Sequence, residues 1–217
     1  MKLYLVRHGQ SVGNERGHLQ GQDASFDKGL SELGKQQSQK VGQRMAAAGL
    51  TALYTSPLPR AAQTAAWIAS ACRLQARERD CLKEVSYGDL EGRSKAETFR
   101  LCPQAYDPHW RRENHVPGGE PIARSYSRAR AAIRTLTAAH DQEDVICLVT
   151  HGEFLSRLID TLLEATEVGF PRYLLDNASV THFARHPGDE RGVWLCHYMG
   201  DTGHLRGLGS PAGKDGW

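Results

Sequence analysis

The sequence predicts an α/β fold with a largely parallel sheet. Apolar runs at residues 3–6, 52–54 and 145–149 have the length of buried strands. Segments with helical spacing of apolar residues follow these runs, so strands and helices alternate along the chain. In a sheet of this kind, ligands bind beyond the carboxyl ends of the strands.

The first 80 residues carry clear turn and cap signals. The first apolar run stops at Arg7-His8-Gly9, as a buried strand does before a turn. Ser31 suits the N-cap of a helix, and Pro59 suits the first position of another. The glycine-rich stretch before Ser31 predicts a long loop of the kind that binds ligands. The predicted order is a strand at 3–6, a loop at 12–29, a helix from 31 to 49, a strand at 52–54 and a helix at 59–72.

The second half contains a segment with weak periodicity, followed by stronger elements. Prolines and a Gly-Gly pair between residues 81 and 121 predict a connecting or lid segment with one short helix. We expect a single domain over 1–199, with 85–121 as an inserted segment and 200–217 as a flexible tail. The predicted order is a helix at 95–101, a helix at 122–139, a strand at 145–149, a helix at 155–162, and strands at 180–183 and 193–196 paired around a turn at 187–189.

Composition and charge exclude several classes of protein. There are 27 Lys and Arg against 25 Asp and Glu, a formal charge of +2, which argues against a chain that coats nucleic acid or an anionic membrane. The five cysteines form no CxxC pair, which favours isolated thiols in a reducing compartment. The apolar start is too short for a signal peptide, and no stretch approaches the ~18 apolar residues of a membrane span. We therefore expect a cytoplasmic protein.

Basic residues follow three of the predicted strands. Arg7 and His8 follow the first strand, Arg60 lies in the helix after the second, and His151 follows the strand at 145–149. Strands of one parallel sheet would bring these four side chains to one edge. So much positive potential in one crevice would be costly unless a dianionic group occupied it, and phosphate is the obvious candidate.

The motifs in this order resemble the histidine phosphatase (phosphoglycerate mutase-like) superfamily. The resemblance covers most of residues 1–183 and implies a three-layer α/β/α sandwich. It rests on LVRHGQS at 5–11, Asn14, TSPLPRAAQTA at 55–65, and VTHG at 149–152.

The resemblance implies a role for each matched residue. His8 would be the nucleophile that becomes a phosphohistidine, with a pKa depressed by Arg7 and Arg60. These arginines, with Asn14 and His151, would hold the phosphoryl oxygens. The segment LKEVSYGDLEG at 82–92 resembles the family segment whose first glutamate protonates the leaving oxygen, which selects Glu84 as the general acid; Asp89 and Glu91 are its competitors.

The choice between a phosphatase and a cofactor-dependent mutase depends on the flanking residues. Val85 and Ser86 replace the Arg-His pair that the mutases have after the glutamate, and Glu153 stands where they have an asparagine. A mutase must retain a bisphosphorylated acid, so the missing cation favours a phosphomonoesterase. Candidate substrate-binding residues, several resembling mutase positions, are Gln20, Gly21, Tyr87, Lys95, Arg111, Arg112 and Gly152.

The expected reaction is hydrolysis of a small phosphorylated metabolite, with no nucleic-acid or membrane partner. The first alternative is a cofactor-dependent phosphoglycerate mutase, which would use a bisphosphorylated glycerate primer; the second is a non-catalytic phosphate-binding protein on the same fold. We expect no other cofactor and no metal, because no His, Cys or carboxylate cluster has ligand spacing. The sequence does not predict an oligomeric state.

Overall fold

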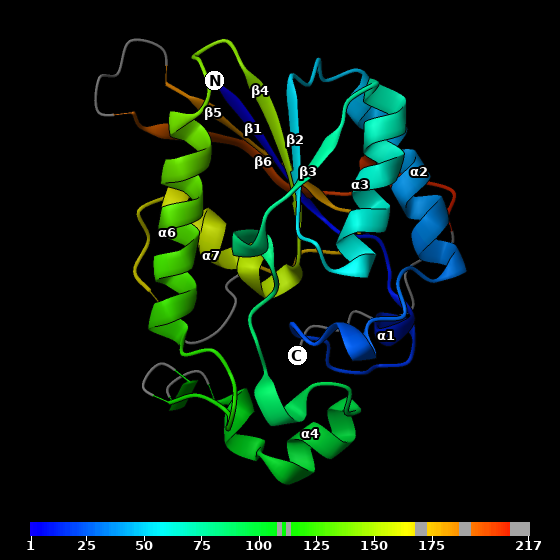
Figure 1. Cartoon of the computed structure of the whole chain (residues 1–217), viewed down its shortest axis with the longest axis vertical. Helices are drawn as coiled ribbons and strands as arrows, with labels where there is room; N and C mark the ends of the chain where they lie inside the picture. Colours follow the sequence, from blue (N-terminus) through cyan, green and yellow to red (C-terminus); the bar gives the residue numbers. More distant parts are fainter. Residues whose placement is uncertain (108–109, 112–113, 168–172, 187–191, 209–217) are drawn as a thin grey trace.

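The computed structural model in Figure 1 describes residues 1–107, 110–111, 114–167, 173–186 and 192–208. Its centre is a six-stranded sheet with the order β3-β2-β4-β1-β5-β6. The strand bounds are β1 Lys2–Arg7, β2 Ala52–Thr55, β3 Ala76–Glu78, β4 Val145–Thr150, β5 Val180–Arg185 and β6 Trp194–Asp201.

The sheet is mostly parallel, as the sequence predicts. β1 pairs in parallel with β4, β4 with β2, and β2 with β3. β5 runs antiparallel to β1, and β6 runs antiparallel to β5. The carboxyl ends of β1, β2 and β4 therefore lie side by side at one edge.

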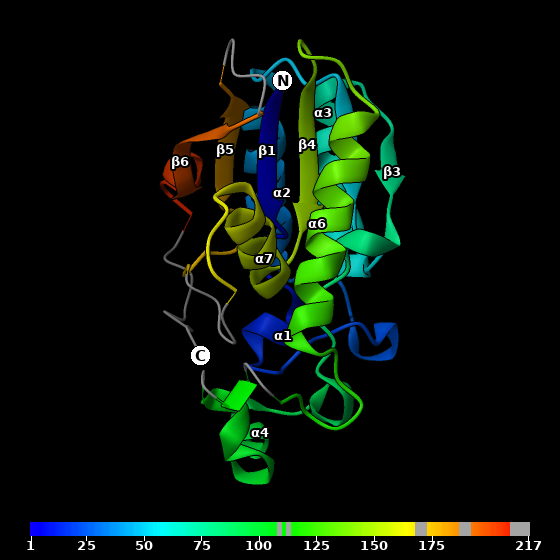
Figure 2. The same cartoon turned by 90° about the vertical axis from the view of Figure 1, so that its left-hand side faces the viewer.

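Helices cover both faces of the sheet. Figure 2 shows α6 (Ile122–Ala138) and α7 (Gly152–Leu162) in front of the sheet, with α2 (Glu32–Ala46) and α3 (Pro59–Cys72) behind it. The alternation of side chains along β4 explains both contacts. Ile146 and Leu148 belong to the core beneath α6 and α7, whereas Cys147 and Val149 belong to the core beneath α2 and α3. The three-layer α/β/α sandwich is confirmed.

A helical segment extends beyond the carboxyl ends of the parallel strands, at the bottom of Figure 1. Tyr87, Leu90, Ala105 and Val116 form a small apolar cluster of their own there. A capping box between Ser94 and Glu97 begins the α-helix of this segment where the sequence predicts one. The elements are η2 Asp80–Leu82, η3 Gly88–Leu90, α4 Lys95–Leu101 and η4 Pro103–Tyr106.

Two local features differ from the sequence prediction. The expected loop at 12–29 contains α1 (Val12–Glu15) and η1 (Ala24–Phe26). The edge strand β3 was missed because it is only three residues long and two of them are charged.

Within the described part of the chain, no helix is both long and apolar enough to cross a membrane.

The chain after residue 200 is also more ordered than expected. β6 continues to Asp201, and η5 (Gly203–Leu205) follows it. The Asp201 carboxylate pairs with Arg44 at 2.7 Å, and Leu205 is buried against the α2 side of the core. The expected boundary at 200 is therefore too early, because these contacts fix residues 200–208. The remainder of the expected tail, and the turn predicted at 187–189, lie outside the described residues.

Candidate active site

The carboxyl ends of β1, β2 and β4 bring the predicted basic residues together. The backbone N–H of His8 donates to the Thr150 carbonyl at 2.9 Å, which places His8 beside the start of α7. The rings of His8 and His151 are 5.1 Å apart between centroids. Arg60 Nε donates to His8 Nε2 at 3.3 Å. Residues more than 140 positions apart in the sequence thus meet in one place.

A hydrogen bond from Nδ1 fixes the tautomer of the His8 ring. Nδ1 lies 2.7 Å from the carbonyl oxygen of Gly9; because a carbonyl only accepts, Nδ1 carries the proton and Nε2 carries the lone pair. Burial, followed by the charges of Arg60 and Arg7, holds the pKa of His8 well below its usual range. Burial, which the sequence does not reveal, is a larger cause than the two arginines. His8 is therefore a neutral imidazole at neutral pH, the form that can attack phosphorus.

His151 is completely buried and is held through one ring nitrogen. Its Nε2 lies 2.8 Å from the hydroxyl of Ser56, the residue that follows β2. That hydroxyl also accepts from the backbone N–H of Leu58 at 3.3 Å, so its own hydrogen is free to donate to Nε2. This arrangement leaves the proton of the neutral ring on Nδ1. Burial and the charge of Arg60 keep the pKa of His151 well below its usual range.

Arg60 is fixed by an acidic residue that the sequence argument missed. The Asp27 carboxylate accepts from Arg60 Nη1 at 2.7 Å, and both side chains are almost completely buried. Arg60 Nη2 donates to the carbonyl of Gly21 at 3.0 Å. The predicted residue Gly21 therefore contacts the site through its backbone. These contacts aim Nε of Arg60 at His8.

Arg7 lies against the N-terminus of α7. Its Nη1 donates to the carbonyl of Leu175. A Cβ at Gly152 would lie only 3.3 Å from Arg7 Nε and Cζ, so the predicted residue Gly152 provides room for the guanidinium. Burial lowers the pKa of Arg7, although the group stays cationic.

Several buried nitrogens have no partner among the described residues. They include Arg7 Nε and His151 Nδ1, which flank His8, and Nε2 of the predicted residue Gln20. Buried N–H donors are normally satisfied, and an unsatisfied one costs about 1–3 kcal/mol. An anion placed over His8 would accept from the first two, which is the requirement of a phosphoryl site.

Glu84 is buried at the N-terminus of α7. Its Oε1 accepts from the backbone N–H groups of Val85 at 3.0 Å and Phe154 at 2.8 Å, and its Oε2 accepts from that of Glu153 at 3.3 Å. Burial, and then the nearby Glu153 carboxylate, raises the pKa of Glu84. These backbone donors favour the charged form but do not outweigh burial. Glu84 can therefore hold a proton at a higher pH than an ordinary glutamate.

The two alternative candidates for the general acid, Asp89 and Glu91, have different surroundings from Glu84. Asp89 is exposed. The Glu91 carboxylate accepts from the Ser86 hydroxyl, and from the backbone N–H groups of Tyr87 and Asp23, at 2.6–2.9 Å. Glu91 thus connects two loops by hydrogen bonds. Both of its carboxylate oxygens already accept hydrogen bonds from these groups.

The Glu153 carboxylate accepts hydrogen bonds from two of the predicted substrate-binding side chains. Arg111 Nη2 donates to it at 2.6 Å, and the Tyr87 hydroxyl donates at 2.5 Å. Arg157, completely buried, donates at 2.6 Å. Burial alone would raise the pKa of Glu153, but the charges of Arg111 and Arg157 outweigh it and lower the pKa. In the sequence, Glu153 is distinguished only as a departure from the mutases, and no pattern there predicts these contacts.

The other predicted residues have different hydrogen-bond partners. The side-chain oxygen of Asn14 accepts from Asn177 Nδ2 at 3.2 Å, and that same amide donates to the His8 carbonyl. The side-chain oxygen of Gln20 accepts from the hydroxyl of Ser11 at 2.5 Å, and Ser11 is the N-cap of the short helix that contains Asn14. Lys95 begins α4 in the segment beyond the sheet, and its backbone N–H donates to Gly17. Arg112 lies outside the described residues.

Comparisons with known proteins find relatives that match nearly the whole chain. A probable phosphoglycerate mutase (GpmB) from Proteus mirabilis is 32% identical over 94% of this chain and 95% of its own. The solved structure of Bacillus stearothermophilus YhfR has a TM-score of 0.84 at 27% identity, with 94% and 98% of the two chains covered. A mycobacterial glucosyl-3-phosphoglycerate phosphatase, solved with VO3, has a TM-score of 0.80 at 27% identity, with 91% and 98% covered.

A family model matches residues 3–197, which include the strand ends that carry Arg7, His8 and His151, the helix that carries Arg60, and the Glu84 loop. With this match, the chain belongs to branch 1 of the histidine phosphatase superfamily.

Proposed function

We propose that this protein is a phosphomonoesterase that hydrolyses a small phosphorylated metabolite through a phosphohistidine on His8. The observation that carries the proposal is the state of three nitrogens at the carboxyl edge of the sheet. His8 presents an unprotonated Nε2, while Arg7 Nε and His151 Nδ1 beside it are buried without a partner among the described residues. A nucleophile between unsatisfied donors suits an incoming phosphate ester.

The reaction proceeds in two steps on these residues. His8 Nε2 attacks phosphorus, a P–N bond forms, the P–O bond to the leaving group breaks, and Glu84 gives its proton to the departing oxygen. Water then attacks the phosphohistidine, Glu84 takes a proton from that water, the P–N bond breaks, and inorganic phosphate leaves. Arg7, Arg60 and His151 stabilise the charge on the transferring phosphoryl oxygens in both steps.

The residues after Glu84 favour hydrolysis over isomerisation. Val85 is 1% exposed, so this position offers an apolar contact instead of a cation. Arg111 is paired with Glu153, which already occupies much of its fork. Retention of a bisphosphorylated acid would need cations for a second anionic group. One of the solved relatives named above is a phosphatase, which supports the same choice.

A phosphoglycerate mutase is the second candidate. The relatives that support it are those named probable phosphoglycerate mutases, at about a third identity over nearly the full chain. In that case a bisphosphorylated glycerate would serve as primer, and Lys95, Arg111 and Arg112 would have to bind the second anionic group. A non-catalytic phosphate-binding protein would have no use for the paired nucleophile and proton donor at His8 and Glu84.

A panel of phosphorylated metabolites, tested with the wild type and His8→Ala, checks the proposal. We expect phosphate release and an acid-labile, base-stable phosphoenzyme from the wild type, and neither from His8→Ala. Activity should survive chelators. Adding 3-phosphoglycerate with its bisphosphate primer separates the candidates, because isomerisation without net phosphate release would establish the mutase. Phosphate binding with no phosphoenzyme would establish the binding protein.

A further inference from the structure

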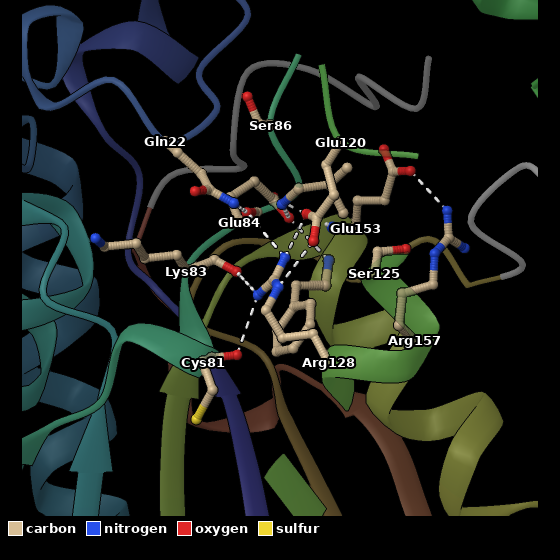
Figure 3. A network of polar contacts seen from close by, with 12 residues as sticks. Gln22, Cys81, Lys83, Glu84, Ser86, Glu120, Ser125, Arg128, Glu153 and Arg157 are labelled. Carbon is tan, nitrogen blue, oxygen red and sulfur yellow. Dashed lines mark hydrogen bonds and ion pairs between the residues drawn. The ribbon is translucent and has the colours of Figure 1, made fainter. Parts of the chain in front are cut away.

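We infer that Arg128 is the positioning residue for the general acid, holding Glu84 from both its main-chain and its side-chain ends. The inference rests on the proposed function, because it concerns the step in which Glu84 protonates the leaving oxygen. Arg128 lies in α6, outside all the motifs that identify the family, and Figure 3 shows its guanidinium at the centre of a polar network around the 81–84 loop.

All five N–H groups of Arg128 are accounted for. Nε and Nη2 donate to the two carboxylate oxygens of Glu120 at 3.0 and 2.6 Å. Nη1 donates to the carbonyls of Cys81 and Lys83 at 3.0 and 2.6 Å, and Nη2 also donates to the carbonyl of Glu84 at 3.2 Å. A guanidinium has five donors in a fixed plane, whereas an ammonium has three, so lysine cannot reproduce this set of contacts.

The second contact of Arg128 is with Phe154, a residue whose backbone binds the carboxylate of Glu84. The guanidinium carbon of Arg128 lies 3.9 Å from the centroid of the Phe154 ring. The backbone N–H of Phe154 is one of the donors to Glu84 Oε1. Arg128 therefore packs against the residue that orients the carboxylate while it binds the carbonyl of the same glutamate. A change of about 1 Å in the position of a proton donor is enough to cost much of its contribution.

Arg128 also links Glu84 to the end of the inserted segment. Glu120, 7% exposed at its side chain, lies where the chain returns from that segment to α6. From the opposite side of the loop, Gln22 Nε2 donates to the Glu84 carbonyl at 2.7 Å. Arg128 thus binds three carbonyls of the loop that carries the general acid. The geometry points to control of the proton-transfer step.

The test compares two esters whose leaving groups need different help. The alkoxide of glycerol phosphate leaves only with a proton, whereas the anion of p-nitrophenyl phosphate leaves without one. The rate of phosphohistidine formation in a single turnover is measured for each ester with the wild type, Glu84→Gln and Arg128→Lys. We expect Arg128→Lys to slow the reaction of the alkyl ester about 10- to 100-fold, part of what general acid catalysis supplies, and that of the aryl ester by no more than about twofold.

Two further variants complete the design. Glu120→Gln weakens the same network and should separate the esters in the same direction, which decides the matter if Arg128→Lys fails to fold. Arg130→Lys is the matched control, because Arg130 lies on the same helix but pairs with Glu167 in an exposed position, and neither ester should respond to it. Equal losses on both esters in Arg128→Lys and Glu120→Gln would overturn the inference. If the wild type forms no phosphohistidine with the alkyl ester and none with the aryl ester, the proposed function would instead be overturned.

Discussion

Replacing Asp27 with asparagine should destabilise the protein because Asp27 is the buried counter-charge of Arg60. Their side chains are 1% and 2% exposed, and the ion pair is 2.7 Å long. Asp27 also accepts from the backbone N–H groups of Gly29 at 2.9 Å and Arg60 at 3.3 Å. Removing one partner of a buried pair costs about 3–5 kcal/mol, and asparagine keeps one acceptor oxygen, so we expect about 3 kcal/mol. At this chain length, that loss lowers Tm by about 6–12 °C.

Urea unfolding with and without inorganic phosphate measures both the loss and its cause. A ligand at a hundred times its Kd stabilises the folded protein by about 2.7 kcal/mol. At one fixed phosphate concentration, the Asp27→Asn protein should gain more than the wild type, because phosphate also supplies the negative charge that Arg60 has lost. Turnover should fall in the same variant, since Arg60 is no longer aimed at His8.

A matched control separates burial from charge. Asp201 also pairs with an arginine, Arg44, at 2.7 Å, but its side chain is 43% exposed. Asp201→Asn should therefore cost less than about 1 kcal/mol. A loss below about 1 kcal/mol in Asp27→Asn, or equal stabilisation of that variant and the wild type by phosphate, would refute the reasoning.

Three other perturbations have defined outcomes. Because Glu84 must hold a proton, kcat/KM in a pH–rate profile should fall as pH rises through the raised pKa of Glu84. Glu84→Gln should abolish this fall at high pH and should lower the rate on an alkyl ester about 10²–10⁴-fold. The pKa values of His8 and His151 are lowered in the folded protein, so the unfolded chain binds more protons than the folded protein below about pH 6.5. The free energy of unfolding should therefore be unaffected by these histidines above about pH 6.5 and should fall below it by up to about 1.4 kcal/mol per pH unit for each histidine. His8→Asn should reduce this dependence of the unfolding free energy on pH. Ser56→Ala leaves the Nε2 atom of His151 without its partner and should weaken phosphate binding about tenfold by calorimetry, whereas Ser125→Ala, a change of another buried serine, should leave it unaltered.

The part of the site that the sequence predicted is the part fixed by local structure. Arg7, His8 and His151 follow strands, and the parallel pairing of β1 with β4 alone brings them together. Arg60 follows from the same rule, because a proline begins its helix directly after β2. Three strong strand signals and one topological rule were therefore enough to gather the basic residues.

The acidic partners could not be predicted in the same way. Asp27 lies in a loop with no periodic signal, and its pairing with Arg60 depends on a chain path that only the tertiary structure defines. Glu153 was noticed as an unusual residue, yet its contact with Arg111 joins α7 to a segment of weak periodicity. Arg128 appeared as one of several arginines along a helix. Nothing in the spacing distinguishes the arginine that binds the Glu84 loop from its exposed neighbours.

The distribution of counter-charges bears directly on what the site can bind. Arg60 is compensated by Asp27, Arg111 shares Glu153 with Arg157, and Arg128 is compensated by Glu120. Among the described residues, no carboxylate oxygen lies within 4 Å of the Arg7 guanidinium. A dianion over His8 thus meets Arg7, on which the charges of Glu84 and Asp176 act without a close ion pair, together with neutral histidine and backbone donors. That potential suits the binding of one phosphoryl group at His8 and permits its release as inorganic phosphate.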